Sequence, residues 1–350
     1  MKLIRSLASV ALATAALAIA LPTQAQITTL QIESAIPAAH ATSKSMEIFK
    51  DEVVRLSDGS MAVEVMPGSK RPLRDLIDDV HVGHIFATWM SVGIFSKLVP
   101  EVAAISLPFV FDNYDQAKRA VAGPIGTLIT RKLEAKGFII LAWMDLGTLQ
   151  VSNSKRPLRT LEDFKGLSIR VLPTTTHLAA FKAIGARPVV MDFTDVATAL
   201  RQGDIDGQEL DYSTIYANKF YESQKYLSDT GHFLDFHVLI ADKKTFASLD
   251  PMQQKAVREA AAIAAVRQHQ ISTEDQATAL ARLRDTGMQF DPLTSKTRAA
   301  LRRATASVID DARKWVGADV VNKVLAVKPT PAAGRVIVSD KASTGKGGPR

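Results

Sequence analysis

Short runs of β-favouring apolar residues alternate with helical patterns of apolar residues along most of this chain. A strand predicted at residues 27–33 is followed by a helix at 42–56, with apolar side chains at helical spacing, and by a second strand at 61–66. Strands joined through a helix pair in parallel, because the helix returns the chain to the end of the sheet where the first strand began. The sequence therefore predicts a layered α/β fold, with helices packed on a sheet.

The same alternation continues towards residue 316. Helices are expected at residues 73–82, 114–136, 177–184, 195–202 and 294–316, and strands at 85–90, 138–144, 167–172, 189–191, 205–210 and 235–241. A polar stretch at 152–157 interrupts the pattern, and a short helix or turn is expected at 161–166. We therefore place a crossing between two lobes near residue 150.

One long helix is expected in the last third of the chain. Asp250 suits the N-cap and Pro251 the first helical position, and no helix breaker follows until Gly287. At about 1.5 Å per residue this segment spans roughly 50 Å, as one helix or as two joined in line. That length exceeds the needs of a single domain, so the segment is predicted to bridge two lobes.

The N-terminal residues have the pattern of a secretory signal peptide. Lys2 and Arg5 precede an apolar run at residues 7–21, and a helix breaker and small residues lead to a predicted cleavage after Ala25. An uncleaved membrane anchor is the alternative, but the run is shorter than the roughly 20 residues that span a bilayer. The mature protein is therefore expected in the periplasm. Residues 329–350, rich in Pro, Gly, Ser, Thr and Lys, are expected to be a disordered tail.

The charge and cysteine content exclude several functions. The formal net charge is +7, of which the leader carries two and the C-terminal tail three, so that about +2 remains for the body. Without a basic arm or an Arg-rich helix in the body, we expect no nucleic-acid binding. The absence of cysteine excludes thiolate zinc sites, disulfides and cysteine nucleophiles.

Arg170 is the strongest candidate for a binding residue. The apolar residues of the strand at 167–172 alternate so that Arg170 lies on the opposite face, close to the carboxyl end of the strand. Ligands of open α/β sheets bind at that edge, and residues 174–176 can cap the helix that follows. An arginine beside a helix N-terminus suits a carboxylate, because the guanidinium donates two parallel hydrogen bonds. A structural salt bridge is the alternative.

The next strand–helix units end at the same edge of the sheet. Thr194 is a candidate cap for the helix at 195–202, which Gly203 would end. The strand at 205–210 then leads to residues 211–212. Phe193 and the 210–212 stretch are therefore candidates for the pocket, with core packing as the alternative.

The sequence lacks the common signatures of enzymes and metal sites. There is no Gly-x-Ser-x-Gly, His-Glu-x-x-His or Gly-x-Gly-x-x-Gly motif. His81 and His84 could share a helix face, but without a third ligand they are a weak zinc signal. His232 and His237 are expected to be structural, hydrogen-bonded imidazoles. We therefore expect no catalytic residue, no metal and no cofactor.

Four motif-rich runs occur in order at residues 153–157, 161–171, 181–189 and 199–209, and include Glu162-Asp163-Phe164-Lys165-Gly166 and Gly203-Asp204-Ile205-Asp206-Gly207. Shorter matches at 37–40, 65–68, 107–111 and 230–232 extend the likeness to about residues 28–325. Together these motifs resemble the periplasmic solute-binding proteins of tripartite ATP-independent (TRAP) transporters, of the dicarboxylate-binding type. The resemblance implies a two-lobed, type II-like binding protein with crossover strands and a long helix spanning both lobes. It also implies that Arg170 forms the salt bridge to a ligand carboxylate.

Two departures from the family pattern bear on the ligand. Residues 147–150 lack the second arginine that many members carry in the crossover strand, and Leu210 stands where many have asparagine. A second acidic group would find little positive charge, which favours a monocarboxylate with an apolar or aromatic body. Asp211 could accept hydrogen bonds from the ligand or could face solvent. The candidate ligand-binding residues are Trp89, Ser91, Leu149, Gln150, Arg170, Phe193, Leu210 and Asp211.

The resemblance also implies an organisation and a partner. Lobe I would comprise residues 26–148 with about 236–275, and lobe II residues 149–235 with about 276–328. The lobes would close over an organic acid, and the closed form, expected to be monomeric, would deliver it to TRAP-type integral membrane permease subunits. A similar binding protein serving another transporter or a sensor is one alternative. An exported hydrolase or lyase is a weaker one.

Overall fold

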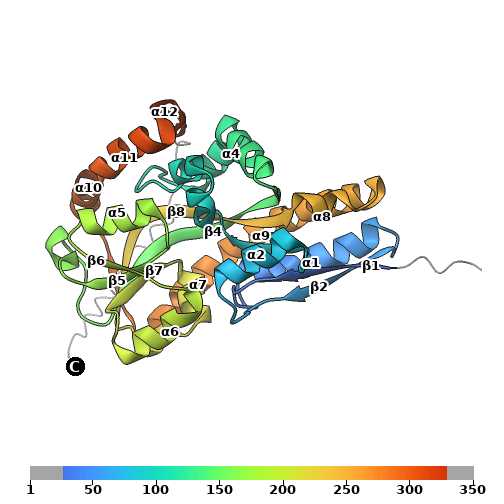
Figure 1. The fold of residues 1–350 in the computed structure, drawn as a ribbon. Coiled ribbons are helices and arrows are strands. Elements are labelled where there is room, and N and C mark those ends of the chain that lie inside the picture. Colours follow the sequence, from blue (N-terminus) through green and yellow to red (C-terminus); the bar gives the residue numbers. More distant parts are fainter. Residues whose placement is uncertain (1–26, 329–350) are drawn as a thin grey trace, which may run out of the picture.

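The computed structural model describes residues 27–328, and within this range nine strands form one mixed sheet (Figure 1). The predicted signal peptide at residues 1–25 and the predicted tail at 329–350 lie outside the described residues. The strand order is β2-β1-β3-β8-β4-β7-β5-β6, and β9 pairs with β8. The strands are β1 (Thr28–Glu33), β2 (Met61–Met66), β3 (Ala87–Ser91), β4 (Phe138–Asn153), β5 (Ser168–Val171), β6 (Arg187–Val190), β7 (Gly207–Leu210), β8 (Tyr226–Asp242) and β9 (Gln289–Pro292). The α/β class is confirmed.

Helices cover both faces of this sheet. The α-helices are α1 (Ala41–Leu56), α2 (Leu73–Val82), α3 (Tyr114–Ala122), α4 (Pro124–Ala135), α5 (Thr175–Ala183), α6 (Phe193–Gln202), α7 (Tyr212–Ala217), α8 (Lys243–Ala247), α9 (Pro251–Asp285), α10 (Ser295–Ala304), α11 (Ala306–Ala312) and α12 (Ala318–Leu325). Shorter turns are η1 (Val92–Lys97), η2 (Pro100–Ile105), η3 (Leu161–Phe164), η4 (Phe220–Glu222) and the π-helical η5 (Arg313–Gly317). No helix in this described range is both long and apolar enough to cross a membrane.

Two long strands, β4 and β8, join the two ends of the molecule. They pair antiparallel over nearly their whole lengths, whereas β1 pairs in parallel with β2 and β3, and β5 with β6 and β7. Strand β3 pairs with the last part of β8, and β7 with the last four residues of β4. The strands predicted at 138–144 and 235–241 are therefore present but much longer than expected. The strand predicted to end at residue 144 continues through Asp145 and Gly147, with a bulge between them.

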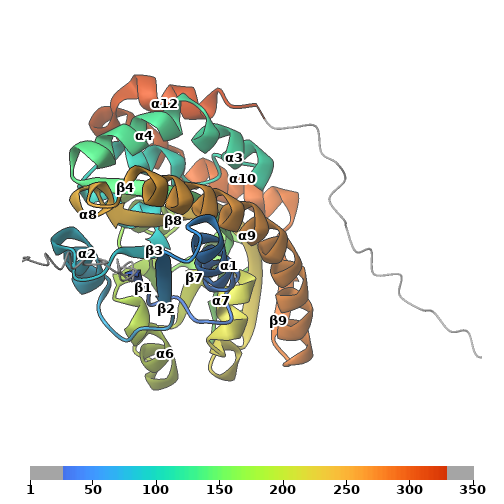
Figure 2. The same ribbon diagram turned by 90° about the vertical axis from the view of Figure 1, so that its right-hand side faces the viewer.

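Helix α9 runs along both ends of the sheet, from α1 to α7 and β9 (Figures 1 and 2). It is one helix of 35 residues, begun by a capping box between Asp250 and Gln253. Midway, the buried side chain of Gln268 accepts a hydrogen bond from Asp145 N and donates one to Asp145 O, at 3.1 and 2.7 Å. The long bridging helix is confirmed, and it is fixed to the crossing strand at its centre.

Some predicted boundaries were wrong. The helix expected at 114–136 is two helices, because Pro124 has no N–H to continue α3 and instead begins α4. Helix α6 begins at Phe193 with Asp192 in the N-cap position, so Thr194 is not its cap. The final helix expected at 294–316 is divided into α10, α11 and α12 and extends to Leu325.

The last helices pack on the end of the molecule that carries α3 and α4. Ala312, Val316, Val321 and Val324 belong to the same buried apolar cluster as Ile129 of α4. Figure 1 shows α12 beside α4, away from β5 and β6. The chain therefore returns to the first end of the molecule after α10.

Candidate ligand-binding site

Arg170, near the carboxyl end of β5, is buried with 2% of its surface exposed. Its Nε and Nη2 donate only to the carbonyl oxygen of Met191, at 3.4 and 3.3 Å, which is long for a hydrogen bond. No carboxylate of the described residues lies within 4 Å of the guanidinium. Burial lowers the pKa of Arg170 to about 10, although the negative charges of Glu209 and Asp192 oppose this shift. Arg170 therefore keeps a buried charge without a partner in contact.

Arg170 faces a cavity of about 50 Å³ that lies between the two ends of the molecule. The first end supplies residues from the segment after β1 and from α2, β3 and η1. The second end supplies residues from β5 and β7 and from the segments that follow β5, β6 and β7. The lining residues are Ala35, Ile36, Leu73, Met90, Ser91, Ile94, Leu146, Arg170, Leu172, Pro173, Phe193, Leu210, Thr214 and His237. The edge of the sheet predicted to carry a site is thus the edge that encloses the cavity.

A bulge in β4 aims one apolar side chain at this cavity. The register shifts between Asp145 and Gly147, so Leu146 drops out of the ladder with β8. Gly147 has φ of +108°, and a Cβ there would lie 2.8 Å from the Nε2 of Gln276. Only glycine suits that conformation and that space. The bulge therefore places Leu146, which is buried, in the wall of the cavity.

The two ends of the molecule touch beside the cavity. A Cβ built on Gly93 of η1 would lie 3.1 Å from the Cγ2 of Thr174, the N-cap of α5. Ser91 Oγ donates to Asp235 Oδ2 at 2.6 Å and accepts from Gly93 N at 3.2 Å. Glycine at this position lets the backbone of η1 approach α5 closely. The predicted capping of α5 by Thr174 is confirmed, since its Oγ1 accepts from His177 N at 3.2 Å.

A second buried charge lies behind the arginine, on β7. The carboxylate of Glu209 is fully buried and accepts from His177 Nδ1 at 2.6 Å, from His232 Nε2 at 2.7 Å and from Leu172 N at 3.0 Å. His232 Nδ1 in turn lies 2.7 Å from the hydroxyl of Thr230. Burial would raise the pKa of Glu209, but the charge and hydrogen bonds of the two histidines outweigh it and lower the pKa to about 2. Glu209 is thus a buried anion whose hydrogen bonds are satisfied.

His237, from the crossing strand β8, lines the cavity opposite the second end of the molecule. Its Nδ1 lies 2.9 Å from the hydroxyl of Thr42, and its Nε2 has no hydrogen-bond partner within residues 27–328. Burial lowers the pKa of His237 well below its ordinary value, and the neighbouring His40 lowers it further. The imidazole therefore faces the cavity as a neutral group.

The structure brings four of the eight predicted site residues together at the cavity: Ser91, Arg170, Phe193 and Leu210. The other four do not line it.

Trp89 is fully buried against the α1 side of the sheet, where its Nε1 donates to Ser43 Oγ at 3.2 Å. Leu149 is fully buried in the apolar core of the second end. Gln150 accepts a hydrogen bond from Gly231 N and donates one to Thr148 O. None of these three therefore lines the cavity that Arg170 faces.

Asp211 is neither exposed nor in the cavity wall. Its carboxylate caps α7, accepting from Thr214 N, from the hydroxyls of Ser213 and Thr214, and from Gln276 Nε2 of α9. Both alternatives considered from the sequence, ligand contact and solvent, are thus replaced by a structural role.

Several lining residues were missed by the sequence. Leu146 reaches the cavity through a bulge that the apolar pattern does not predict, although a glycine within a strand, here Gly147, can indicate a bulge. Met90 lies near the end of β3, and Ile94 lies in η1, which directly follows that strand. His237 was expected to be only structural.

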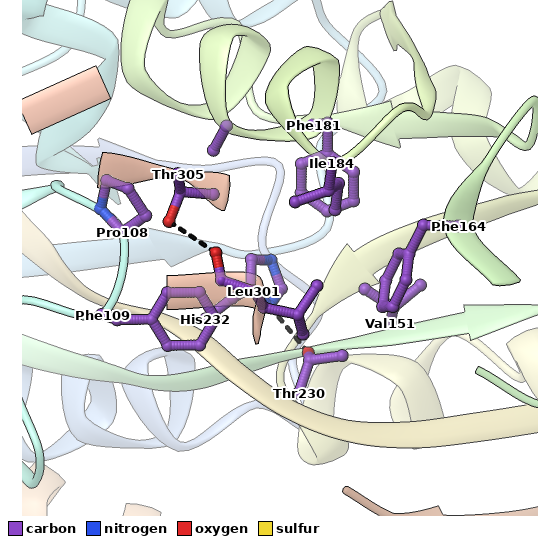
Figure 3. A pocket seen from close by; sticks show the side chains of 11 residues that line it. Pro108, Phe109, Val151, Phe164, Phe181, Ile184, Thr230, His232, Leu301 and Thr305 are labelled. Atoms are coloured by element: carbon purple, nitrogen blue, oxygen red, sulfur yellow. Dashed lines mark hydrogen bonds between the residues drawn. The ribbon is translucent and has the colours of Figure 1, made fainter. Parts of the chain in front are cut away.

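A second, much smaller cavity of about 10 Å³ lies in the apolar core of the second end (Figure 3). Its wall consists mainly of Phe109, Phe164, Phe181 and Leu301, with the hydrogen-bonded His232 on one side. That volume is about the space of a single water molecule, and no charged side chain lines it. Nor does the described part of the chain contain a group of three or more histidines and carboxylates placed to hold a metal ion.

A sheet crossed by two long strands, a helix along both ends and a buried arginine facing the cavity between them are the features of a two-lobed solute-binding protein. The profile of the family "bacterial extracellular solute-binding protein, family 7" matches residues 33–314, and the chain belongs to this family. The resemblance drawn from the sequence motifs is confirmed.

Relatives of known name and structure agree with this assignment. The chain is 33% identical over 277 residues to a solute-binding protein of Verminephrobacter eiseniae, covering 79% of this chain and 83% of the relative. The sugar acid binding protein DctPAm of Advenella mimigardefordensis, solved with galactonate, matches with a TM-score of 0.84 and 30% identity over 86% of this chain and 98% of that one. A TRAP periplasmic solute-binding protein of Polaromonas, bound to D-erythronate, matches with a TM-score of 0.83 and 31% identity over 87% and 100%.

Proposed function

We propose that this protein captures a small organic acid outside the cytoplasm and delivers it to a TRAP-type membrane permease. The observation that carries the proposal is the buried guanidinium of Arg170, which faces a cavity and has no carboxylate of the described residues within 4 Å. Family membership and relatives with galactonate and D-erythronate support the class of solute.

A carboxylate is the ligand group that this arginine lacks. Burying an unpaired charge is unfavourable, and a carboxylate both neutralises the charge and accepts two parallel hydrogen bonds from the planar guanidinium. Lysine could not replace it, because an ammonium is a point charge without the fork geometry. The carboxylate of the ligand is therefore expected to supply the negative charge and the hydrogen-bond acceptors that Arg170 lacks in the folded protein.

Capture would occur by closure of two lobes about the crossing strands β4 and β8. We assign residues 26–148 with about 236–275 to lobe I and residues 149–235 with about 276–328 to lobe II. The packing of Ala312 to Val324 with α4 argues that the last helices move with lobe I instead. The close approach of Gly93 to Thr174 supports a closed arrangement that excludes water from the cavity.

The remaining parts of the proposal follow from the same role. Cleavage of a signal peptide after Ala25 would release a periplasmic, monomeric protein that binds its solute without turning it over and needs no cofactor. Its partners would be the solute and the integral membrane subunits of the permease. Neither nucleic acid nor a metal ion is required.

Calorimetric titration of the mature protein with organic acids, after unfolding and refolding to remove any bound solute, tests the proposal. We expect Arg170→Ala to lower the affinity by two to three orders of magnitude, because loss of one partner of a buried ion pair costs about 3–5 kcal/mol. Arg170→Lys should also bind poorly. Arg187→Ala is the control, since Arg187 is exposed on the neighbouring strand and bonds to Gly166 O. Unchanged affinity in Arg170→Ala would refute the assignment.

A further inference from the structure

The cavity that Arg170 faces has few polar groups to offer a solute. Besides Arg170, only Ser91, Thr214 and His237 line it with polar side chains. The Ser91 hydroxyl donates its one hydrogen to Asp235 Oδ2 at 2.6 Å, and the Thr214 hydroxyl donates its own to Asp211 Oδ2 at 2.5 Å. Both hydroxyls are therefore committed to buried carboxylates of the protein.

Two side-chain groups remain that can donate to the solute, while the oxygens of the two hydroxyls can still accept from it. One is the fork of Arg170, and the other is the Nε2 of His237, which has no partner within the described residues. Arg170 is also the sole lysine or arginine among the described residues that line the cavity. A second carboxylate on the solute would consequently have no cation to pair with.

The rest of the wall is apolar and comes from both ends of the molecule. Leu73, Met90 and Ile94 line it from the first end, and Leu172, Phe193 and Leu210 from the second. A solute hydroxyl placed against such side chains loses its hydrogen bonds to water and finds no replacement, which weakens binding about ten- to a hundredfold for each hydroxyl. A methyl or methylene group there gains from leaving water.

The size of the cavity limits the solute further. Its volume is about 50 Å³. An apolar cavity of about 150 Å³ accepts benzene, so this smaller cavity favours a hydrocarbon body with fewer carbon atoms than a benzene ring. A short aliphatic chain is the better match.

We propose, on the basis of the proposed function, that the solute is a short-chain aliphatic monocarboxylate. Its carboxylate pairs with Arg170, its hydrocarbon body lies against Ile94 and Leu210, and it carries at most one polar substituent, which faces His237. The relatives solved with galactonate and D-erythronate have polyhydroxylated ligands, so this chain differs from them in the class of acid it selects.

Titration with acids of similar length tests this selectivity. The probes are 3-methylbutanoate, 2-hydroxy-3-methylbutanoate, succinate, D-erythronate and benzoate, added to the refolded mature protein. We expect 3-methylbutanoate or its 2-hydroxy derivative to bind at least tenfold more tightly than the other three acids. Tighter binding of succinate, D-erythronate or benzoate, with loss in Arg170→Ala, would overturn the proposal of a short-chain aliphatic monocarboxylate with at most one polar substituent and leave the proposed function standing. Binding that does not depend on Arg170 would overturn both.

A variant of the apolar wall provides the second test. Ile94 is partly buried in η1, and Ile94→Asn should weaken binding of 3-methylbutanoate about tenfold and narrow its advantage over D-erythronate. Leu161→Asn is the matched control, a partly buried apolar residue of η3 that does not line the cavity. Both variants are checked for folding by circular dichroism. Equal affinities for 3-methylbutanoate in the Ile94 variant, the control and the unmodified protein would refute the placement of the hydrocarbon body.

Discussion

The two neighbouring strands β5 and β7 each bury a charged side chain, but the two charges differ in their hydrogen-bond partners. On β7, Glu209 has two histidines and a backbone N–H as hydrogen-bond donors within 3.0 Å. On β5, Arg170 has only one carbonyl oxygen, at more than 3.2 Å. The sites are linked, because the N–H that Glu209 accepts belongs to Leu172, two residues after Arg170. A buried charge with its partners stabilises the fold, whereas one without a partner leaves room for a ligand.

The largest effect should follow removal of the satisfied charge. Glu209→Ala would leave His177, His232 and Leu172 N without their acceptor, and we expect the free energy of unfolding to fall by about 3–5 kcal/mol. Urea denaturation of the ligand-free protein measures this. Glu162→Ala is the control, an exposed carboxylate paired with Lys165 at 2.7 Å, for which about 0–1 kcal/mol is expected.

Equal losses for the two glutamate variants would show that the hydrogen bonds of Glu209 do not stabilise the second end of the molecule. Glu209→Gln separates charge from shape, since the amide fills the same space but can no longer accept from both histidines as a carboxylate does. Its stability should lie between those of the unmodified protein and Glu209→Ala.

The comparison of these strands also explains what could be predicted from the sequence. The position of Arg170 near the carboxyl end of its strand was predictable, because the alternation of apolar residues fixes the face on which it lies and Pro173 fixes the end of the strand. The class of fold followed from the strand–helix order, and the bridging helix from an uninterrupted pattern between two clear boundary signals. These features depend on neighbours in sequence.

The remaining contacts depend on residues distant in sequence. Leu149 and Gln150 were offered as ligand contacts, but the bulge at Leu146 shifts the register of β4 and exchanges the side chains that reach the cavity. Asp211 caps its own helix and also accepts from Gln276, 65 residues further along the chain. The partnership of Glu209 with His177 and His232 likewise requires three elements to meet. No local pattern specifies such meetings.

The free energy of unfolding should depend on pH through three buried histidines and through Glu209. Burial lowers the pKa of His40, His232 and His237 from 6.5, so the unfolded chain binds more protons than the folded one below that pH. Stability is therefore full above pH 6.5 and falls below it, by about 1.4 kcal/mol per histidine for each pH unit until the folded-state pKa is reached. Glu209, with its pKa lowered to about 2, adds a second loss as the pH falls from 4.5 towards 2.

Denaturation midpoints between pH 3 and pH 8 measure these two steps. Asp145 and Asp235 act in the opposite direction, because burial raises their pKa values and the folded state then binds the extra protons. Glu209→Gln should remove the step below pH 4.5 and keep the one below 6.5. His84→Asn is the control for the upper step, since His84 is exposed and no change is expected. Persistence of the lower step in Glu209→Gln would mean that other carboxylates cause it.

The smallest effect should come from Arg170 itself, and it should have the opposite sign. Arg170→Met removes a buried charge that lacks a counter-ion and replaces it with an apolar side chain of similar length in an apolar wall, so the ligand-free protein should be stabilised by about 1 kcal/mol. The same substitution abolishes the rise in melting temperature that a bound acid produces in the unmodified protein. A destabilised Arg170→Met variant would place the arginine with Glu209 among the structural charges. Stabilisation together with loss of binding would show that Arg170 lowers the stability of the ligand-free protein and is needed to bind the anion.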